Sequence, residues 1–209
     1  MQPLSLEEQL SPRGVATPNV RERLFEAAEA VLEREGPAGL TNRSVTEEAG
    51  CAKGLLYNHF TDLDDFVAQL VLDRFRRVAE EVAPLPGRAG EGAVLENLTE
   101  AALALLGSHG AVIAAVALSR RGVTERVEEA WAGGAPGPTA VENALAAYLE
   151  EEQRRGRVGS AVDCPMLALA VTGTVHHLLM TGGARPGDDR QLVRRLVGAL
   201  AGGATAAGS

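Results

Sequence analysis

The sequence predicts an all-α fold in which a small N-terminal group of short helices is joined to a larger C-terminal helical bundle. Apolar residues recur at spacings of three and four along most of the chain, which is the period of a helix with one buried face. Glycine and proline cluster between these segments and divide the chain into separate helices. Because the chain has no alternating run of β-branched residues, we expect no sheet.

The composition is that of an ordinary globular protein. The 209 residues suffice for one or two domains, and 45% are hydrophobic and 23% charged. The two cysteines, Cys51 and Cys164, lie far apart, which excludes a disulfide framework and a CxxC metal knuckle within one chain. The 28 acidic and 20 basic residues give a net charge of -8, which at first argues against a nucleic-acid partner.

Two uncharged stretches, residues 101–119 and 164–184, are long enough to span a membrane. The first is interrupted at Gly107, the second carries Thr172 and His176, and neither is flanked by a cluster of Lys or Arg. The N-terminus lacks a basic region followed by an apolar run, so we expect no signal peptide. We predict buried helices in a soluble cytoplasmic protein that does not contact a membrane.

Four helices are predicted in the N-terminal part, after a mobile arm over residues 1–17. Thr17 and Pro18 resemble an N-cap and a first helical residue, and Gly36 with Pro37 ends this first helix. Thr41 caps a second, short helix that Gly50 terminates. The third and fourth helices are expected from about Lys53 to His59 and from about Leu63 to Val82.

The second half of the chain is also helical by pattern. A loop is predicted where glycine and proline are concentrated, at residues 133–138. The expected helices are Gly92 to Leu106, Ala111 to Arg120, Val123 to Ala132, Thr139 to Arg155, Pro165 to Thr181 and Asp188 to Ala201.

The second and third helices form a helix-turn-helix around the turn Gly50–Ala52. Gly50 can adopt the positive φ that so sharp a turn requires. The side chains expected to pack on the first and fourth helices are apolar: Val45, Ala49, Cys51, Leu56 and Phe60. The side chains left on the outer face are those of Lys53, Gly54, Leu55, Tyr57, Asn58 and His59. A helix with such an outer face fits the major groove of DNA.

The run from Leu40 to Phe60 resembles the DNA-binding domain of the tetracycline-repressor (TetR) family. The Ala-Gly, Lys-Gly and Leu-Tyr-x-His-Phe elements carry the resemblance, which extends over about 60 residues. It implies a ligand-responsive transcriptional regulator, expected to be a repressor, that binds a double-stranded DNA operator as a homodimer and is released by a small-molecule effector. It implies phosphate contacts from Thr41, Tyr57 and His59, with a further backbone contact from Arg43. Lys53 and Gly54 would lie at the groove, with Asn58 as a candidate base reader and Leu55 against a thymine methyl.

The sequence departs from the family pattern at Ala52, Leu55 and Leu63. The family usually has Ser or Thr at the first position, often Thr at the second and a Lys near the third. These departures favour weaker DNA binding, or binding that relies more on Arg13, Arg21 and Arg23. They also support an alternative function, a helical module that binds a small molecule or protein and has lost specific DNA binding.

The resemblance divides the chain into an arm (1–17), a helix-turn-helix domain (18–62), a ligand-binding and dimerisation domain (63–203) and a tail (204–209). The helices near Thr139 to Arg155 and Pro165 to Thr181 would build the dimer interface, since the second is apolar around most of its circumference. Polar residues on apolar stripes are candidates for the effector site. They are Asn97, His109, Trp131, Tyr148, Thr172 and His176.

No enzyme motif is recognised in the sequence. HExxH, the P-loop, GxGxxG and GxSxG patterns are all absent, and no His has Asp or Glu three residues before it. We expect no catalysis, no metal site and no cofactor.

The acidic net charge is compatible with DNA binding when its distribution is considered. Residues 49–61 contain no acidic residue and hold Lys53, the one lysine in the chain. Glu47, Glu48 and Asp62 flank this window. We therefore expect small docking faces on an otherwise repulsive surface, with weak and salt-sensitive non-specific binding.

Overall fold

The computed structural model describes residues 20–107, 110–181 and 189–205, and within these ranges it contains helices and no strand, which confirms the all-α prediction. The predicted arm, His109 and residues 206–209 of the predicted tail lie outside the described residues. The α-helices are α1 (Val20–Glu35), α2 (Asn42–Glu48), α3 (Leu55–His59), α4 (Leu63–Val82), α5 (Val94–Leu106), α6 (Gly110–Leu118), α7 (Arg121–Ala132), α8 (Pro138–Arg154), α9 (Cys164–Thr181) and α10 (Asp189–Thr205).

Most helices begin and end close to their predicted bounds, and α4 has the bounds predicted for it. Two short 3₁₀ helices, η1 (Pro37–Gly39) and η2 (Leu85–Arg88), follow α1 and α4 where proline was expected to stop them. α10 continues to Thr205, so residues 204 and 205 of the predicted tail are helical.

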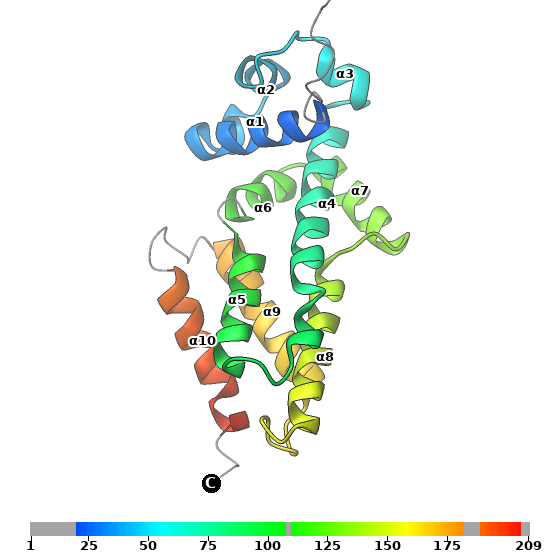
Figure 1. Cartoon of the computed structure of the whole chain (residues 1–209). Coiled ribbons are helices and arrows are strands. Elements are labelled where there is room, and N and C mark those ends of the chain that lie inside the picture. Colours follow the sequence, from blue (N-terminus) through cyan, green and yellow to red (C-terminus); the bar gives the residue numbers. More distant parts are fainter. Residues whose placement is uncertain (1–19, 108–109, 182–188, 206–209) are drawn as a thin grey trace, which may run out of the picture.

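The N-terminal helices α1, α2 and α3 pack with the first turns of α4 around one core, at the top of Figure 1. Three phenylalanines form its centre, with ring centroids 5.8 Å apart for Phe25 and Phe60, 5.6 Å for Phe25 and Phe66, and 4.9 Å for Phe60 and Phe66. These rings come from α1, from the residue that ends α3, and from α4. The aromatic cluster therefore ties the outermost short helix to the long helix that leaves the domain.

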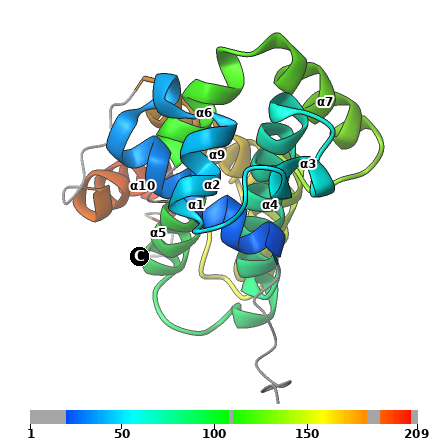
Figure 2. The same ribbon diagram turned by 90° about the horizontal axis from the view of Figure 1, so that it is seen from above.

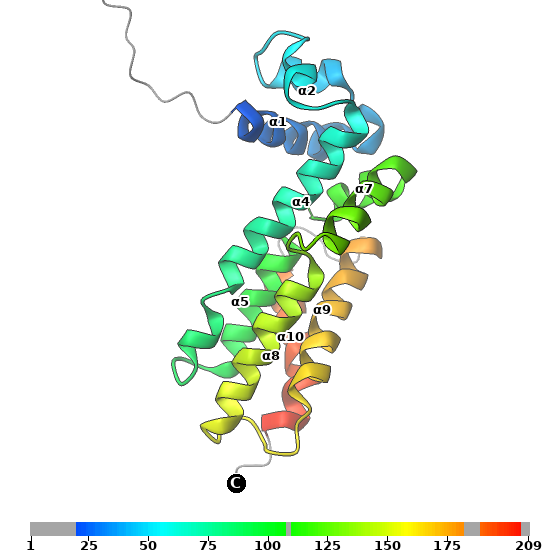
Figure 3. The same cartoon turned by 90° about the vertical axis from the view of Figure 1, so that its right-hand side faces the viewer.

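The long helix α4 runs from the N-terminal domain into a second bundle made by α5, α8, α9 and α10 (Figure 1). Figure 3 shows the elongated shape that results, with the N-terminal domain at one end and the long helices at the other. In this bundle α8 packs along α9, and α10 packs against α5 and α9. Its core includes Leu98, Leu145, Leu149, Val171 and Val193, all fully buried.

Helices α6 and α7 lie between these two groups (Figure 1), and in the view from above α7 projects outward from the body of the protein (Figure 2). Ile113 and Val116 from α6, with Val123 and Val127 from α7, are buried in the same core as the N-terminal helices. This upper core therefore contains side chains from both sides of the boundary expected at residue 62. The packing of α6 and α7 is therefore continuous with that of the N-terminal domain.

α9 is long and apolar enough to cross a membrane by length and composition, and 28% of that stretch is buried in the single chain. α5 and α6 pass the same test together but are bent by 45° at their junction. The inner side of α9 carries Leu167, Val171 and Val175 and belongs to the bundle core. We interpret α9 as a core helix whose outer side is left uncovered in one protomer.

Candidate functional site

The helix-turn-helix owes its geometry to two local features. Thr41 is the N-cap of α2, where its side chain accepts a hydrogen bond from the Ser44 amide at 3.0 Å and the Ser44 hydroxyl accepts one from the Thr41 amide at 2.9 Å. Gly50 has a φ of 62°, in the left-handed region that the turn after α2 requires. Val45 and Leu56, one from each helix, are fully buried beneath the turn.

The predicted DNA-binding residues share one exposed surface of α2, α3 and the turn, with Leu55 half-buried at its edge. Tyr57 has 59% of its surface exposed although it is aromatic. Arg43 pairs with Glu47 on its own helix, Nε to Oε1 at 2.7 Å. The exposed residues of this surface are Thr41, Arg43, Lys53, Gly54, Tyr57, Asn58 and His59.

α3 begins at Leu55, two residues later than predicted. Its N-cap is Gly54, which has no side chain to accept a hydrogen bond from the first helical amides. Ala52 also lacks a capping oxygen, and its carbonyl instead closes a turn with the Leu55 amide at 2.9 Å. The missing cap and the low helix propensity of glycine together explain the shortened helix.

Arg21 and Arg23, expected from the sequence to support DNA binding, lie within α1 and contact the N-terminal domain itself. The Arg21 guanidinium lies 4.8 Å from the ring centroid of Phe60, and it also donates to the Gln69 side chain. Arg23 Nη2 donates to the carbonyl of Ala49 at 2.8 Å, at the C-terminus of α2. Both arginines therefore stabilise the helix-turn-helix through contacts from α1. Arg13 lies outside the described residues.

A cavity of about 260 Å³ lies where the two cores meet. Its wall is formed by α4, α5, α6, α7 and α9 and is mostly apolar. A mostly apolar concave site with a few polar groups is typical of small-molecule binding. Its apolar side chains include Val71, Phe75, Val78, Leu105, Ile113, Ala117, Val127 and Leu179.

Two of the six predicted effector-binding residues, Trp131 and His176, line this cavity. Trp131 packs edge-to-face on Phe75 with ring centroids 5.2 Å apart, and its Nε1 has no hydrogen-bond partner within the part of the chain described. Thr172 is buried and donates to the carbonyl of Ala168 at 3.0 Å within α9. That intrahelical bond satisfies its hydroxyl.

Asn97 and Tyr148 meet in a buried polar network near the start of α5, at the end of that helix remote from Leu105 and the cavity. Asn97 Nδ2 donates to Tyr148 Oη at 2.8 Å and to the carbonyl of Glu91 at 2.9 Å. Glu152, also fully buried, accepts from the Gly90 amide at 3.1 Å and pairs with Arg157 at 3.3 Å. This buried network lies at the far end of the bundle. Asn97 and Tyr148, two of the predicted effector-binding residues, are therefore not brought together with Trp131 and His176.

Sequence reasoning missed Arg74, Thr124 and Glu128, which also line the cavity. Arg74 could have been found, because it follows Val71 by three residues and precedes Val78 by four on the buried stripe of α4. A charged residue at such a position is rare without a partner and points to a polar task inside an apolar wall. Thr124 and Glu128 lie one turn apart on α7, and nothing in the sequence pattern around them indicates that they line a cavity.

The cavity wall is fastened to the N-terminal domain by two ion pairs. Arg120, at the N-cap of α7, places Nε 2.6 Å from Asp64 Oδ1. Arg126, on α7, places Nη2 2.8 Å from Asp62 Oδ2. Both aspartates belong to the first turn of α4 or its N-cap, immediately after α3.

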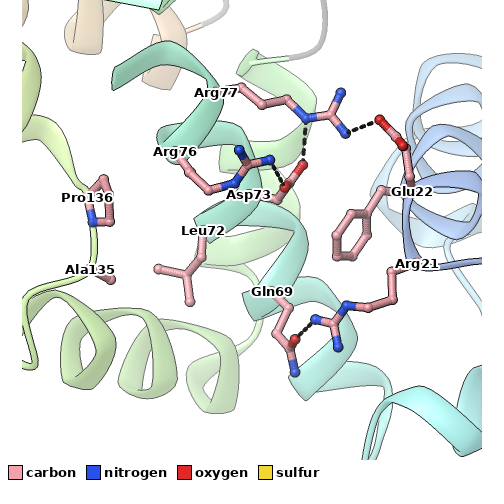
Figure 4. Close-up of a pocket in the computed structure, with 10 residues that line it drawn as sticks. Arg21, Glu22, Gln69, Leu72, Asp73, Arg76, Arg77, Ala135 and Pro136 are labelled. Carbon is pink, nitrogen blue, oxygen red and sulfur yellow. Dashed lines mark hydrogen bonds and ion pairs between the residues drawn. The ribbon is translucent and has the colours of Figure 1, made fainter. Parts of the chain in front are cut away.

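A second, polar groove of about 360 Å³ lies between α1, α4 and the loop at Ala135 and Pro136 (Figure 4). In Figure 4 the Asp73 carboxylate lies between two arginines, with bonds of 2.6 Å from Arg76 and 2.7 Å from Arg77. Arg77 also reaches Glu22 of α1 at 3.5 Å. Because its charges pair with one another and link α1 to α4, this groove is a poor candidate for a ligand site.

The titratable side chains of the described residues do not form a recognisable metal site. No group of three or more His, Cys, Asp or Glu side chains comes together there. Cys164 is buried, and burial raises the pKa of its thiol, which makes it less reactive.

Comparison with known proteins agrees with this architecture. Residues 24–70 match the family described as bacterial regulatory proteins, tetR family. No curated protein sequence matches the chain at a significant level.

Solved structures with the same fold cover nearly the whole chain. A protein described as a TetR-family transcriptional regulator from Mesorhizobium loti has 17% identity and a TM-score of 0.68, over 91% of this chain and 96% of that one. FadR from Bacillus subtilis, solved with stearoyl-CoA, has 18% identity and a TM-score of 0.63, over 86% and 96%. A TetR regulator from Streptomyces coelicolor has 20% identity and a TM-score of 0.56, over 90% and 99%. At these identities the likeness establishes a shared fold.

Proposed function

We propose that the chain, whose residues 24–70 match the tetR family of bacterial regulatory proteins, is a repressor released from its operator by a small-molecule effector. The match and the shared fold support a DNA-binding transcriptional regulator. The observation that carries the proposal is the place of the cavity, whose walls include α4 and α7. α4 directly follows the recognition helix α3, and two ion pairs join α7 to the first turn of α4.

The DNA-binding surface would dock α3 in the major groove. Lys53 and Gly54 lie at the N-terminal end of α3, the end whose residues meet base edges in helix-turn-helix proteins. A Cβ at Gly54 would meet no atom within 4 Å, so the protein's own packing does not require glycine there. We infer that this glycine leaves room for DNA, with Asn58 reading a base and Thr41, Arg43, Tyr57 and His59 contacting phosphates.

Pairing of two protomers would supply the two half-sites of an operator. Exposed apolar side chains gather on α9, where Met166 is 56%, Leu169 46% and Met180 39% exposed. The outer side of α8 carries instead the exposed polar residues Asn143, Glu150 and Arg154. The dimer interface is therefore proposed to centre on α9, with α8 at its side, and to set two α3 helices about 34 Å apart.

Effector binding would lower operator affinity by favouring one of two arrangements. A ligand between α4, α7 and α9 binds best when these helices take the spacing that fits it. The Arg120 and Arg126 ion pairs and the shared upper core pass that spacing to the start of α4 and so to α3. In a dimer, a small rotation at each α4 changes the separation of the two recognition helices. That the shared fold can hold a small molecule is supported by FadR from Bacillus subtilis, solved with stearoyl-CoA.

The proposal is tested by the affinity of the purified protein for DNA flanking its own gene, measured by fluorescence anisotropy at several salt concentrations. We expect salt-sensitive binding that Lys53→Ala and Tyr57→Ala weaken by about tenfold or more each. Arg154→Ala, at the far end of α8, removes an equally exposed positive charge and should leave affinity unchanged. If the wild type and both α3 variants bind this DNA no better than unrelated DNA, the chain is a binding module without operator specificity.

A further inference from the structure

Arg74 is a cation in the apolar wall of the effector cavity, and the structure leaves it poorly paired. Its Nη2 donates to the carbonyl of Ala104 at 3.5 Å, at the long limit for a hydrogen bond. Its Nε is buried and has no partner among the residues that the structure describes. A buried N–H without a partner is destabilising and rare in native proteins.

The chain makes room for this guanidinium. A Cβ built on Gly107 would lie 1.5 Å from Arg74 Nη2, so the charged group occupies a niche at the C-terminus of α5 that a glycine leaves open. The carbonyls at that helix end attract the positive charge of Arg74. The one hydrogen bond described for this guanidinium, to Ala104, is long and therefore weak.

The neighbouring acids do not supply the missing partner. Asp73, the adjacent residue on α4, is shared by Arg76 and Arg77 at 2.6 and 2.7 Å. Glu128 also lines the cavity, but it is exposed, and no ion pair joins it to Arg74 among the described residues. Apart from Thr124 and His176, the remaining wall is formed by apolar side chains, so Arg74 carries the one formal positive charge of the described lining.

We propose that the cavity binds an amphiphilic anion, whose carboxylate pairs with Arg74 and whose apolar part fills the space among α4, α6, α7 and α9. Arg74 lines the cavity, and its Nε–Nη2 edge now lies against Gly107 and the Ala104 carbonyl. Rotation of the side chain out of this niche would present that edge to a carboxylate, which a guanidinium holds through two parallel hydrogen bonds. The volume of about 260 Å³ corresponds to about nine water-sized volumes of ~30 Å³ each, which suits a head and tail of about ten non-hydrogen atoms. A medium-chain fatty acid has this size and polarity. The inference rests on the proposed function, because it names the chemical class of the effector.

The test is a direct binding measurement by isothermal titration calorimetry with octanoate, octanamide and octylamine, which share a tail and differ in the head group. The full-length wild type should bind octanoate about tenfold more tightly than octanamide, and octylamine more weakly still. Arg74→Met, which keeps an unbranched side chain, should bind octanoate and octanamide equally. Arg74→Lys should keep a reduced preference, because an ammonium cannot form the two parallel bonds.

Glu128→Gln is the matched control, since it removes the other charge of the cavity, and it should retain the preference for octanoate. Equal affinity for octanoate and octanamide in the wild type, or an unchanged preference in Arg74→Met, would overturn the proposal. So would the absence of binding by all three compounds. Selective binding of octylamine that is lost in Glu128→Gln would assign the cavity to cations instead.

DNA release is measured separately, so failure of this inference and failure of the proposed function can be told apart. If octanamide binds as well as octanoate and both release the operator, the proposed function stands and the anionic class is wrong. If octanoate binds selectively through Arg74 but leaves operator affinity unchanged, the anionic class stands and the proposed release mechanism is wrong.

Discussion

Arg126 of α7 holds the residue that caps the long helix α4: its Nη2 lies 2.8 Å from Asp62 Oδ2, while Asp62 Oδ1 accepts the Asp65 amide at 2.7 Å. One aspartate thus joins the wall of the cavity to the first turn of the helix that follows the recognition helix. A second ion pair makes the same connection, with Arg120 Nε 2.6 Å from Asp64 Oδ1. These contacts cross between parts of the chain more than fifty residues apart in sequence.

The first prediction concerns these two ion pairs. Replacing Arg120 and Arg126 by Gln should reduce the change in operator affinity that an effector causes, because α7 then loses its charged links to α4. Each pair is partly exposed, so the variant should lose only about 0.2–1 kcal/mol of stability per pair. Operator anisotropy with and without effector measures the coupling, and calorimetry measures effector affinity.

The control for this prediction is Arg121→Gln. Arg121 pairs with Glu125 within α7, at 2.7 Å, so the variant removes a charge from the same helix without breaking a link to α4. It should respond to the effector as the wild type does. Equal responses in Arg121→Gln and in the double variant would show that the ion pairs do not transmit the signal.

A second prediction concerns the uncapped recognition helix. Ala52→Thr should supply the missing capping oxygen and lengthen α3 toward Lys53. The free energy of unfolding should then rise by about 0.5–1 kcal/mol, and operator affinity should rise as well. Ala52→Val has the same shape without the oxygen and is the matched control. Chemical denaturation and anisotropy would measure the two effects. A gain that is equal in the Thr and Val variants would mean that capping is not its cause.

A third prediction follows from the buried phenol. Burial, opposed by the hydrogen bond from Asn97 and reinforced by Glu152, raises the pKa of Tyr148 to about 12 from the ordinary 10.0. Because the folded-state pKa is the higher one, the stabilisation is complete below about pH 10 and is lost as the pH rises toward 12. The free energy of unfolding should therefore fall over that interval, by up to about 1 kcal/mol per pH unit.

Tyr148→Phe should remove the part of the alkaline decrease in the free energy of unfolding that Tyr148 causes. It should also cost about 1–2 kcal/mol at neutral pH, because Asn97 Nδ2 loses one of its two acceptors. Denaturant titrations at a series of pH values measure both effects. An identical alkaline slope in wild type and Tyr148→Phe would contradict the assignment.

A fourth prediction tests the exposed side of α9. Leu169→Lys should convert a dimer into monomers, because a charge placed at the centre of an apolar interface loses its hydration without gaining a partner. Light scattering coupled to gel filtration gives the mass, and circular dichroism verifies the helix content. Leu169→Met keeps the surface apolar and should remain dimeric. A monomeric wild type, or a dimeric Leu169→Lys variant, would place the interface elsewhere.

The sequence predicts the local elements of this protein well, because their causes are local. Thr41 caps α2, Gly50 turns the chain, and α4 begins and ends where Asp62 and the following prolines require. The late start of α3 was missed, although its cause, the absence of a capping oxygen at Ala52, is visible in the sequence.

The cavity was less predictable, because it depends on which helices meet in space. Trp131 and His176 reach it from α7 and α9, whereas Asn97 and Tyr148, equally polar on equally apolar stripes, bond to each other at another end of the bundle. A stripe pattern identifies a buried polar residue but does not identify its partner. Arg74 differs in kind, since a charge on the stripe of α4 has no such ordinary explanation.

The central claim is that a ligand in the cavity and DNA on α3 oppose each other. It is tested most directly by the dissociation constant for the operator, measured with and without a saturating concentration of a compound that raises the melting temperature of the wild type. The account predicts that the compound weakens operator binding by about 5- to 150-fold, and that the operator weakens binding of the compound by the same factor. An operator affinity that is the same with and without the bound compound would contradict it.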